Sequence, residues 1–400
     1  RLAEIKAHSE FGRAWEEETK NFVYKCNVNT EILDWTVSLF EDYYKLFTKV
    51  LPIPKQKGSK PKVHHFKNAA DYQDWAGMAG TAGYFSSGEN ALNFYYDPMD
   101  VGFTTNVMLH EGMHLLTHQI NPDFVAPTWI NEGLAEYFGS SMVEKKKRGK
   151  GWDITPGQML DHRLLVMQDF IEQDKFVRLD KLFGKQFGAY GYTDYAHGWT
   201  FVHFLMESAE YSKKFKKYFR DLYTLKGKFK QYAKGKGTRV FISPAEVGEH
   251  LLAYLKKADL KELEGEWISF VRDEMVAEGG RGYFYLGRDM SMQGRAEEAL
   301  KNLSKAIEEL GYATPRAHYF RAKTYRSLGQ REEAIAEVRV ALDKDPTNAE
   351  FRVYLASLLP KKEKVEAVRQ LKLACELEPD DATYPWRLEQ FRANGRLFIF

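Results

Sequence analysis

Apolar positions in the first hundred residues alternate between helical and strand spacing. Between residues 31 and 50 they recur every three or four positions, which predicts an amphipathic helix that ends before Pro52 and Pro54. Shorter runs predict further elements: a strand at 62–66, a helix at 69–75, and strands at 82–86 and 91–96 joined through residues 87–90. This part of the chain is therefore expected to form a small mixed sheet with helices.

The next long apolar segment, 107–116, is interrupted by His110, Glu111 and His114. Its pattern predicts a helix that is buried nearly all round. Residues four apart share one face of a helix, so the two histidines are able to bind one ion together. Buried polar groups need partners, and a metal ion would satisfy all three side chains. The alternative is a helix with two ordinary histidines. Gly112 costs roughly 1 kcal/mol relative to alanine inside a helix, which indicates close approach of another backbone or a substrate.

Glu132 stands eighteen residues after His114, in a second helical segment that stops at Gly139, a suitable residue beyond a helix C-terminus. Two histidines and one glutamate form a catalytic zinc set that leaves a fourth position open for water or substrate. The sequence therefore predicts one Zn²⁺ ion bound by His110, His114 and Glu132, with Glu111 as the general base.

These motifs resemble those of the gluzincin zinc metallopeptidases, in particular the aminopeptidase N-like group. In that family an Asn-Glu-Gly-x-Ala helix follows the His-Glu-x-x-His helix, and its Glu is the third zinc ligand; residues 131–135 read Asn-Glu-Gly-Leu-Ala here. A tyrosine in a Tyr-x-Lys-Gly stretch steadies the oxyanion in the family. Tyr195 matches it, sixty-three residues past Glu132, with His197 in place of the lysine.

The resemblance implies an α+β, thermolysin-like catalytic domain at 1–275, mixed α/β at 1–100 and mainly helical at 101–275. It implies hydrolysis of peptide bonds by metal-activated water, with Glu111 as general base and Tyr195 as oxyanion stabiliser. The competing interpretation of Tyr195 is aromatic packing.

In gluzincins an edge strand beside the zinc holds the extended substrate by β-augmentation. Leu92, Asn93 and Phe94 belong to a predicted strand that would serve this purpose. The alternative is an ordinary hairpin arm.

Three residues are candidates for supporting roles. Glu136, one turn past Glu132, would accept a hydrogen bond from a ligand histidine, or it is a plain surface residue. His118 continues the four-residue series as a supporting or packing residue, about 6 Å further along the helix. His197 is a second candidate for a place beside the metal or the oxyanion.

One element of the aminopeptidase N-like group is missing. Its Gly-x-Met-Glu-Asn loop, whose glutamate binds the substrate's amine, has only Gly88-Glu89-Asn90 as a counterpart. Exopeptidase specificity is therefore not supported. The resemblance is closer to small bacterial gluzincin-like proteins in which a compact peptidase domain precedes helical repeats.

Small residues recur at fixed intervals from residue 282 onward. The matching positions are Gly294, Ala299 and Ala306 with Gly329, Ala334 and Ala341, and then Ala334, Ala341 and Pro346 with Ala367, Ala374 and Pro379. Period and pattern resemble tetratricopeptide repeats, so 276–400 is predicted to be an all-α solenoid of about three repeats. Its groove is a candidate site for a protein partner, or the solenoid braces the catalytic domain.

Composition narrows the classes of partner. A net charge of +2 over 400 residues argues against nucleic acid, which demands a concentrated basic face. No apolar run approaches the ~18 residues of a membrane span. Cys26 and Cys375 are too few for a disulfide scaffold. The chain begins with Arg1, so a signal peptide could have preceded it; localisation is open, with a secreted or periplasmic site slightly favoured over the cytoplasm.

Two functional hypotheses of different classes follow, and a hydrolase that acts on a non-peptide amide would use the same machinery as the first. The first is a zinc peptidase that acts on a peptide or protein substrate and carries a tetratricopeptide adaptor. The second is a catalytically silent, peptidase-like scaffold that binds protein partners through its repeats. Every recognised catalytic position is filled, which favours the enzyme.

Overall fold

The computed structural model describes residues 2–54, 59–76, 80–98, 100–233, 235, 237–379 and 381–395. The chain divides into two compact units, described separately below. Unit 1 comprises Arg1–Met159 and Met167–Met275, and unit 2 comprises Leu160–Val166 and Val276–Phe400. The division into a peptidase-like domain at 1–275 and a repeat domain at 276–400 stays a prediction.

Unit 1 contains a small mixed sheet, as predicted. Its strands run in the order β1 (Trp15–Glu18), β2 (Val23–Cys26), β3 (Lys62–Phe66), β5 (Ala91–Tyr95) and β4 (Gly83–Ser86). The three inner strands β2, β3 and β5 are parallel, whereas β1 and β4 are antiparallel to their neighbours. Strands β3, β4 and β5 correspond to the predicted strands, and β1 and β2 were not predicted.

The predicted long helix is α2 (Thr30–Val50), and Asn29 begins it by accepting a hydrogen bond from the amide of Ile32 at 2.8 Å. Its buried face carries the large apolar side chains Leu33, Leu39, Phe40, Tyr43 and Phe47. The shorter predicted helix is α3 (Ala69–Ala76).

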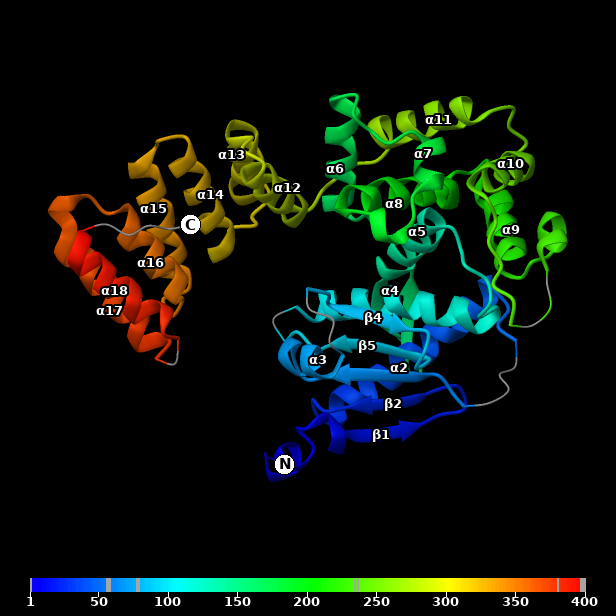
Figure 1. Cartoon of the computed structure of the whole chain (residues 1–400), viewed down its shortest axis with the longest axis horizontal. Helices are drawn as coiled ribbons and strands as arrows, with labels where there is room; N and C mark the ends of the chain where they lie inside the picture. The colour runs from blue at the N-terminus through cyan, green and yellow to red at the C-terminus, as the bar shows by residue number, and fades with distance from the viewer. Residues whose placement is uncertain are drawn as a thin grey trace. The chain divides into compact units, whose positions relative to one another are not determined.

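Three helices stack beyond the sheet, and Figure 1 shows α5 (Thr128–Gly139) between α4 (Val101–Ile120) and α8 (Tyr192–Glu207). Glycines permit this closeness. A Cβ at Gly133 of α5 would lie 2.6 Å from Cγ2 of Val202 and 2.7 Å from the carbonyl oxygen of Gly198, both on α8. A Cβ at Gly139 would lie 3.0 Å from Cβ of His110 on α4.

Two sequence-based interpretations of glycines are corrected. Gly112 accommodates the rings of α2, not a backbone or a substrate, because its Cβ would lie 2.5 Å from Cε2 of Phe40 and 3.2 Å from Cε1 of Tyr43. Gly139 is the last residue of α5 and has no positive φ, so it serves the crossing with α4 and not a left-handed cap.

The other elements of unit 1 are mostly short helices and a hairpin. The hairpin consists of β6 (Met142–Lys145) and β7 (Trp152–Thr155). The helices are α1 (Leu2–Ala7), α6 (Asp161–Glu172, whose first half belongs to unit 2), α7 (Leu179–Gly184), α9 (Ser212–Tyr223), α10 (Pro244–Leu255) and α11 (Leu260–Asp273), with 3₁₀ turns η1 (Phe11–Arg13), η2 (Phe187–Ala189) and η3 (Gly227–Tyr232).

Unit 2 is helical, as predicted. Its elements are α12 (Gly280–Met292), α13 (Ala296–Ser304), the π-helical turn η4 (Lys305–Glu309), α14 (Pro315–Ser327), α15 (Arg331–Lys344), α16 (Ala349–Leu358), η5 (Lys361–Glu363), α17 (Lys364–Leu377) and α18 (Thr383–Asn394). All six recurring alanines are buried, so small side chains lie where the helices meet. The turn glycines Gly294 and Gly329 have φ of 80° and 78°, a conformation that favours glycine.

The start of α6 is packed against the start of α12 within unit 2. The carboxylate of Asp161 accepts hydrogen bonds from the amides of Glu278 at 3.2 Å and Gly279 at 2.9 Å. The rings of His162 and Tyr285 lie 6.1 Å apart. Residues 160–166 are thus part of the repeat unit, although they stand over a hundred residues before the repeats.

No described helix is long and apolar enough to cross a membrane. Cys26 and Cys375 are both free thiols.

The crossing of α5 and α8 predicts the effect of one substitution. We expect Gly133→Ala to lower the free energy of unfolding by about 1–3 kcal/mol, because the added methyl overlaps Val202 and the backbone of Gly198. Gly265→Ala in α11 is the matched control, since no atom lies within 4 Å of its Cβ and alanine favours a helix by about 0.5–1 kcal/mol. Urea unfolding followed by circular dichroism measures both; equal midpoints for Gly133→Ala and the native chain would contradict the close crossing.

A buried histidine in β3 predicts the pH dependence of stability. Burial lowers the pKa of His65 to about 3; its Nδ1 lies 2.8 Å from the Thr36 hydroxyl, and its Nε2 has no hydrogen-bond partner within the described chain. The unfolded chain, with a histidine pKa of about 6.5, takes up the proton first as the pH falls. The stability that His65 contributes is therefore complete above pH ~6.5 and is lost below it, by about 1.4 kcal/mol per pH unit.

We expect the native chain to lose more stability between pH 6.5 and 5 than His65→Asn, which keeps a partner for Thr36 but cannot be protonated. The comparison uses the difference between the two pH values, so any constant cost of the substitution cancels. Parallel losses in both proteins would show that His65 does not titrate in this way.

Candidate functional site

Helix α4 places His110 and His114 on one face. Asp100 begins the helix by accepting a hydrogen bond from the amide of Phe103 at 2.8 Å. The apolar side chains around the two histidines are buried, namely Met108, Leu109, Met113, Leu115 and Leu116. The hydroxyl of Tyr43 donates to the carbonyl of Leu109 at 3.0 Å and ties α4 to α2. Both imidazoles are therefore fixed in position by a helix that is packed on several sides.

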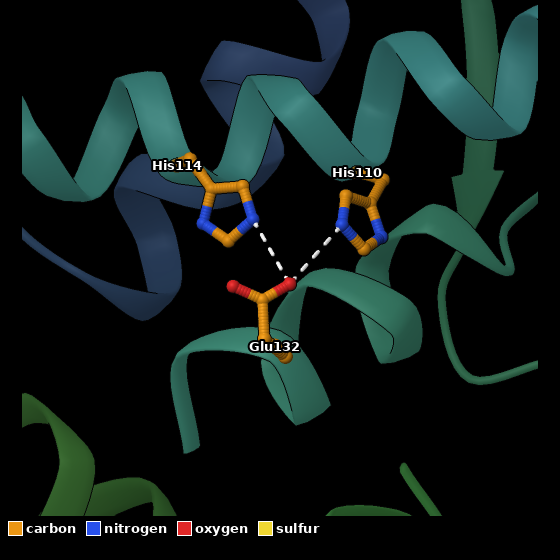
Figure 2. A group of neighbouring side chains, drawn as sticks. All are labelled: His110, His114 and Glu132. Atoms are coloured by element: carbon orange, nitrogen blue, oxygen red, sulfur yellow. Dashed lines mark ion pairs between the residues drawn. The ribbon is translucent and has the colours of Figure 1, made fainter. Parts of the chain in front are cut away.

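Helix α5 brings Glu132 to the same point. Figure 2 shows the imidazoles of His110 and His114 extending from α4 toward one oxygen of the Glu132 carboxylate, which extends from α5. That oxygen, Oε2, lies 3.6 Å from Nε2 of His110 and 3.5 Å from Nε2 of His114. One ligand atom from each residue lies within 4.8 Å of the other two.

These distances fit the spacing of ligands around a metal ion. Zinc bonds of about 2.0–2.1 Å in tetrahedral geometry place two ligand atoms roughly 3.4 Å apart. A direct N–H···O hydrogen bond would bring the same atoms to about 2.7–3.2 Å. The observed 3.5 and 3.6 Å correspond to the first arrangement. Two imidazoles and a carboxylate are also a donor set that zinc accepts.

The other ring nitrogens have neighbours of their own. Nδ1 of His114 lies 3.0 Å from the side-chain nitrogen Nδ2 of Asn131. The side-chain oxygen of Asn131 accepts a hydrogen bond from the hydroxyl of Tyr223 at 3.2 Å. Nδ1 of His110 lies 4.0 Å from Oε1 of Glu136. Glu136 thus faces a candidate ligand and is only partly exposed, and its supporting role stays a prediction.

The electrostatics of the site are dominated by the buried carboxylate. Burial alone would raise the pKa of Glu132, but the charges and contacts of His114 and His110 hold that pKa well below its usual range. Burial alone would lower the pKa of His110, but the contact with Glu132 and the charges of Glu111 and Glu136 raise it to about 9. The pocket therefore favours positive charge between α4 and α5.

The three residues form part of one wall of a cavity of about 520 Å³. Glu111 and Tyr195 line the same cavity, so the structure brings together the five residues to which the sequence analysis gave principal roles. Tyr195 also packs edge-on against Tyr190, with ring centres 5.1 Å apart. Tyr195 therefore lines the cavity and packs against an aromatic ring at the same time.

His118 lines this cavity as well, one turn beyond His114. Its ring lies 5.2 Å from that of Phe85 on β4. This contact agrees with the packing role considered for it.

The prediction that His197 lies beside the candidate metal ligands or the oxyanion is wrong, since it does not line the cavity. Its Nε2 accepts a hydrogen bond from the amide of Val177 at 2.9 Å, and its Nδ1 lies 2.7 Å from the carbonyl of Thr193. Nε2 thus ties α8 to the preceding segment, Nδ1 contacts a carbonyl within α8, and the ring is fully buried. The residue that aligns with the lysine of the gluzincin Tyr-x-Lys-Gly stretch is thus a histidine with a structural role in this chain.

The predicted edge strand is also wrong. Leu92, Asn93 and Phe94 belong to β5, which pairs with β3 on one side and β4 on the other, so β5 has no free edge. The strand at the edge of the sheet is β4, and Gly83, Tyr84 and Phe85 of that strand line the cavity. In a simple hairpin of β4 and β5, one edge of β5 would be free, but here that edge is hydrogen-bonded to β3.

Several residues of the site were not found from the sequence. Asn131 stands in the Asn-Glu-Gly motif itself, and the motif was a signal for it. Tyr223 lies 92 positions further on and has no local signal, because only the fold brings α9 beside α5. The apolar rim at Val125, Phe187 and Phe241 was likewise unpredicted.

Comparisons with known proteins add little on activity. A family described as "Protein of unknown function (DUF1570)" matches residues 105–226, which include all three candidate ligands, Glu111 and Tyr195. No curated protein matches the chain. The chain resembles a solved structure described as the crystal structure of YrrB, a TPR protein with an unusual peptide-binding site. The identity is 16%, the match covers 48% of this chain and 90% of that one, and the TM-score of 0.28 is too low to bear on fold or function.

Proposed function

We propose that this protein is a zinc-dependent hydrolase of peptide bonds, with a gluzincin-type, thermolysin-like catalytic domain. The observation that carries the proposal is the convergence of His110, His114 and Glu132 from two helices, with all ligand atoms within 4.8 Å, on the wall of a cavity. Three protein ligands beside an open cavity are typical of a catalytic zinc site, whereas structural sites are closed by a fourth.

One Zn²⁺ ion held by these three residues would acidify a water molecule and polarise the scissile carbonyl. Glu111, the neighbour of His110 on α4, takes the proton from the attacking water. It then delivers this proton to the nitrogen of the leaving amine as the carbon–nitrogen bond breaks. The hydroxyl of Tyr195 donates a hydrogen bond to the carbonyl oxygen as it gains negative charge.

One side chain beside the imidazoles is suited to a supporting role. Glu136 faces the outer nitrogen of His110 at 4.0 Å, and its carboxylate would attract the proton that this nitrogen carries when Nε2 binds the ion. Strand β4 offers the backbone of its outer edge to an extended substrate by β-augmentation, the role first assigned to β5. Gly83 helps β4 to lie against α4, since its Cβ would come within 2.7 Å of Val107.

The test combines metal content with cleavage. We expect the native chain to bind one zinc ion and to cleave members of a mixed peptide library. Glu111→Gln should bind the same amount of zinc but cleave about 10²–10⁴-fold more slowly, because only proton transfer is lost. Zinc per chain is measured by mass spectrometry and cleavage by chromatography.

Glu132→Ala is the complementary variant, since it removes a ligand and should lose both zinc and activity. Undiminished cleavage by Glu111→Gln would overturn the assigned role of that residue. Zinc binding by Glu132→Ala at the native level would overturn the metal site.

A second candidate function is binding of protein partners through unit 2, with or without catalysis. One observation favours it: a cation–aromatic–cation pattern recurs thirty-five residues apart in α12 and α14. On α14 the cations of Arg316 and Lys323 lie 5.9 and 5.5 Å from the ring centre of Phe320. On α12 the Arg281 and Arg288 guanidiniums lie 5.6 and 4.9 Å from that of Tyr285.

Helix α14 has basic residues but no acidic ones, so this surface is suited to an acidic segment. We expect an acidic fluorescent peptide to bind the full chain more tightly than a lysine-substituted counterpart, and more weakly in high salt. Arg316→Glu with Lys323→Glu should reduce binding about tenfold or more.

Lys361→Glu with Lys362→Glu is the control, because it makes the same charge change at exposed positions on η5. An equal effect of both double variants would mean that only net charge matters, which would contradict a binding surface on α14.

A further inference from the structure

Exposed apolar side chains gather at the rim of the cavity that holds the candidate ligands. Val125 is 41% exposed, Phe187 is 70% exposed and Phe241 is 64% exposed, and all three line this cavity. Single exposed apolar residues are ordinary on a protein surface, but several around one opening mark a binding site. The rim is therefore suited to bulky apolar groups.

Backbone hydrogen bonds hold one side of this rim together. The amide of Val125 donates to the carbonyl of Val240 at 3.0 Å, and the amide of Val240 donates to the carbonyl of Asp123 at 2.8 Å. This pairing brings Val125 close to Phe241, the residue after Val240, although they are far apart in sequence. Phe187 comes from η2, a different segment that precedes α8. Three separate segments thus present apolar side chains to the same opening.

The cavity has no acidic group left for a substrate's amino terminus. Among the described residues that line it, Glu111 and Glu132 alone carry carboxylates, and both have roles in the proposed chemistry. The residues of unit 1 outside the described ranges include neither Asp nor Glu. Glu89, the counterpart of the aminopeptidase glutamate, is exposed in the turn between β4 and β5 and does not line the cavity.

The lysine in the described lining is already paired. Nζ of Lys185 lies 2.5 Å from Oδ1 of Asp194, a buried carboxylate that also accepts a hydrogen bond from the amide of Gly191 at 2.9 Å. Moving Lys185 to a substrate would leave Asp194 buried without its counter-ion, which is strongly unfavourable. Lys185 therefore serves the start of α8 and is a poor partner for a substrate's terminal carboxylate.

We infer that the cleft binds internal segments of a polypeptide, with bulky apolar side chains packed against Phe187 and Phe241, so the enzyme is an endopeptidase. An internal segment has no terminal charge to neutralise, and this matches a cavity in which the charged groups of the described lining residues are all engaged. Its extended backbone lies along β4, whose residues Gly83, Tyr84 and Phe85 line the same cavity. The inference rests on the proposed function and specifies its substrate class.

The first experiment compares matched peptides with the zinc-loaded native chain. One peptide has a central Phe-Leu pair and is prepared with acetyl and amide ends or with free ends; the other has Ser-Ser at the same place. We expect blocked and free forms of the apolar peptide to be cleaved at similar rates, and the serine peptide about tenfold or more slowly. Cleavage that requires a free terminus, or that ignores the Phe-Leu pair, would overturn the inference.

The second experiment measures binding without turnover. Glu111→Gln is titrated against the fluorescently labelled, blocked apolar peptide, and anisotropy gives the dissociation constant. Adding Phe187→Ser or Phe241→Ser should weaken binding about tenfold. Trp386→Ser is the matched control, since Trp386 is a 53% exposed aromatic residue on α18 outside this cavity, and it should leave binding unchanged.

The two experiments separate the inference from the proposed function. If no peptide is cleaved but binding depends on Phe187 and Phe241, the hydrolase proposal fails and the apolar polypeptide site stands. If peptides are cleaved but only from a free end, the hydrolase proposal stands and the endopeptidase inference fails. Binding that is equally weakened by Trp386→Ser counts against the site.

Discussion

The candidate site depends on how closely the helices α2, α4, α5 and α8 are packed. Each crossing has a glycine where a side chain would overlap its neighbour: Gly112 between α2 and α4, Gly139 between α4 and α5, and Gly133 between α5 and α8. Because α5 is held at a short distance from both neighbours, Glu132 reaches the imidazoles of α4 without bending either helix. The glycines weaken the helices that contain them, and the packing that they allow is what positions the ligands.

The same crossings bring two imidazoles to the buried carboxylate of Glu132. A carboxylate buried beside two imidazoles is stable only if positive charge accompanies it, either as protons on the rings or as a bound cation. The raised pKa of His110 and the lowered pKa of Glu132 both reflect this requirement. Metal ligands must be deprotonated, so an ion entering the site would replace protons while keeping the sign of the charge.

Local patterns allowed much of this to be predicted. The four-residue spacing of His110 and His114 and the Asn-Glu-Gly stretch around Glu132 identified the cluster, because short-range helical geometry decides which side chains share a face. The long-range parts were not predictable. The pairing of β3 with β5 removes the free edge that Leu92, Asn93 and Phe94 were expected to offer, and nothing in the strand's own sequence encodes its second neighbour.

His197 illustrates a second limit. It stands two residues after Tyr195 in the family's pattern, but on a helix these two side chains point in different directions. One faces the cavity and the other enters the core beneath α8. The amide of Val177, which occupies its Nε2, comes from a segment whose position depends on the whole unit. The glycines show a third limit, since their presence was visible but the rings and helices that they accommodate were not.

The first half of α6 has a practical consequence for dividing the chain. Residues 160–166 pack with the repeats, while the rest of that helix continues into the other unit. Truncation after residue 275 would deprive the Asp161 carboxylate of the Glu278 and Gly279 amides and would strip Tyr285 of its neighbour His162. Each fragment would carry a newly exposed surface, so a boundary chosen from the repeat pattern alone would yield two pieces prone to aggregation.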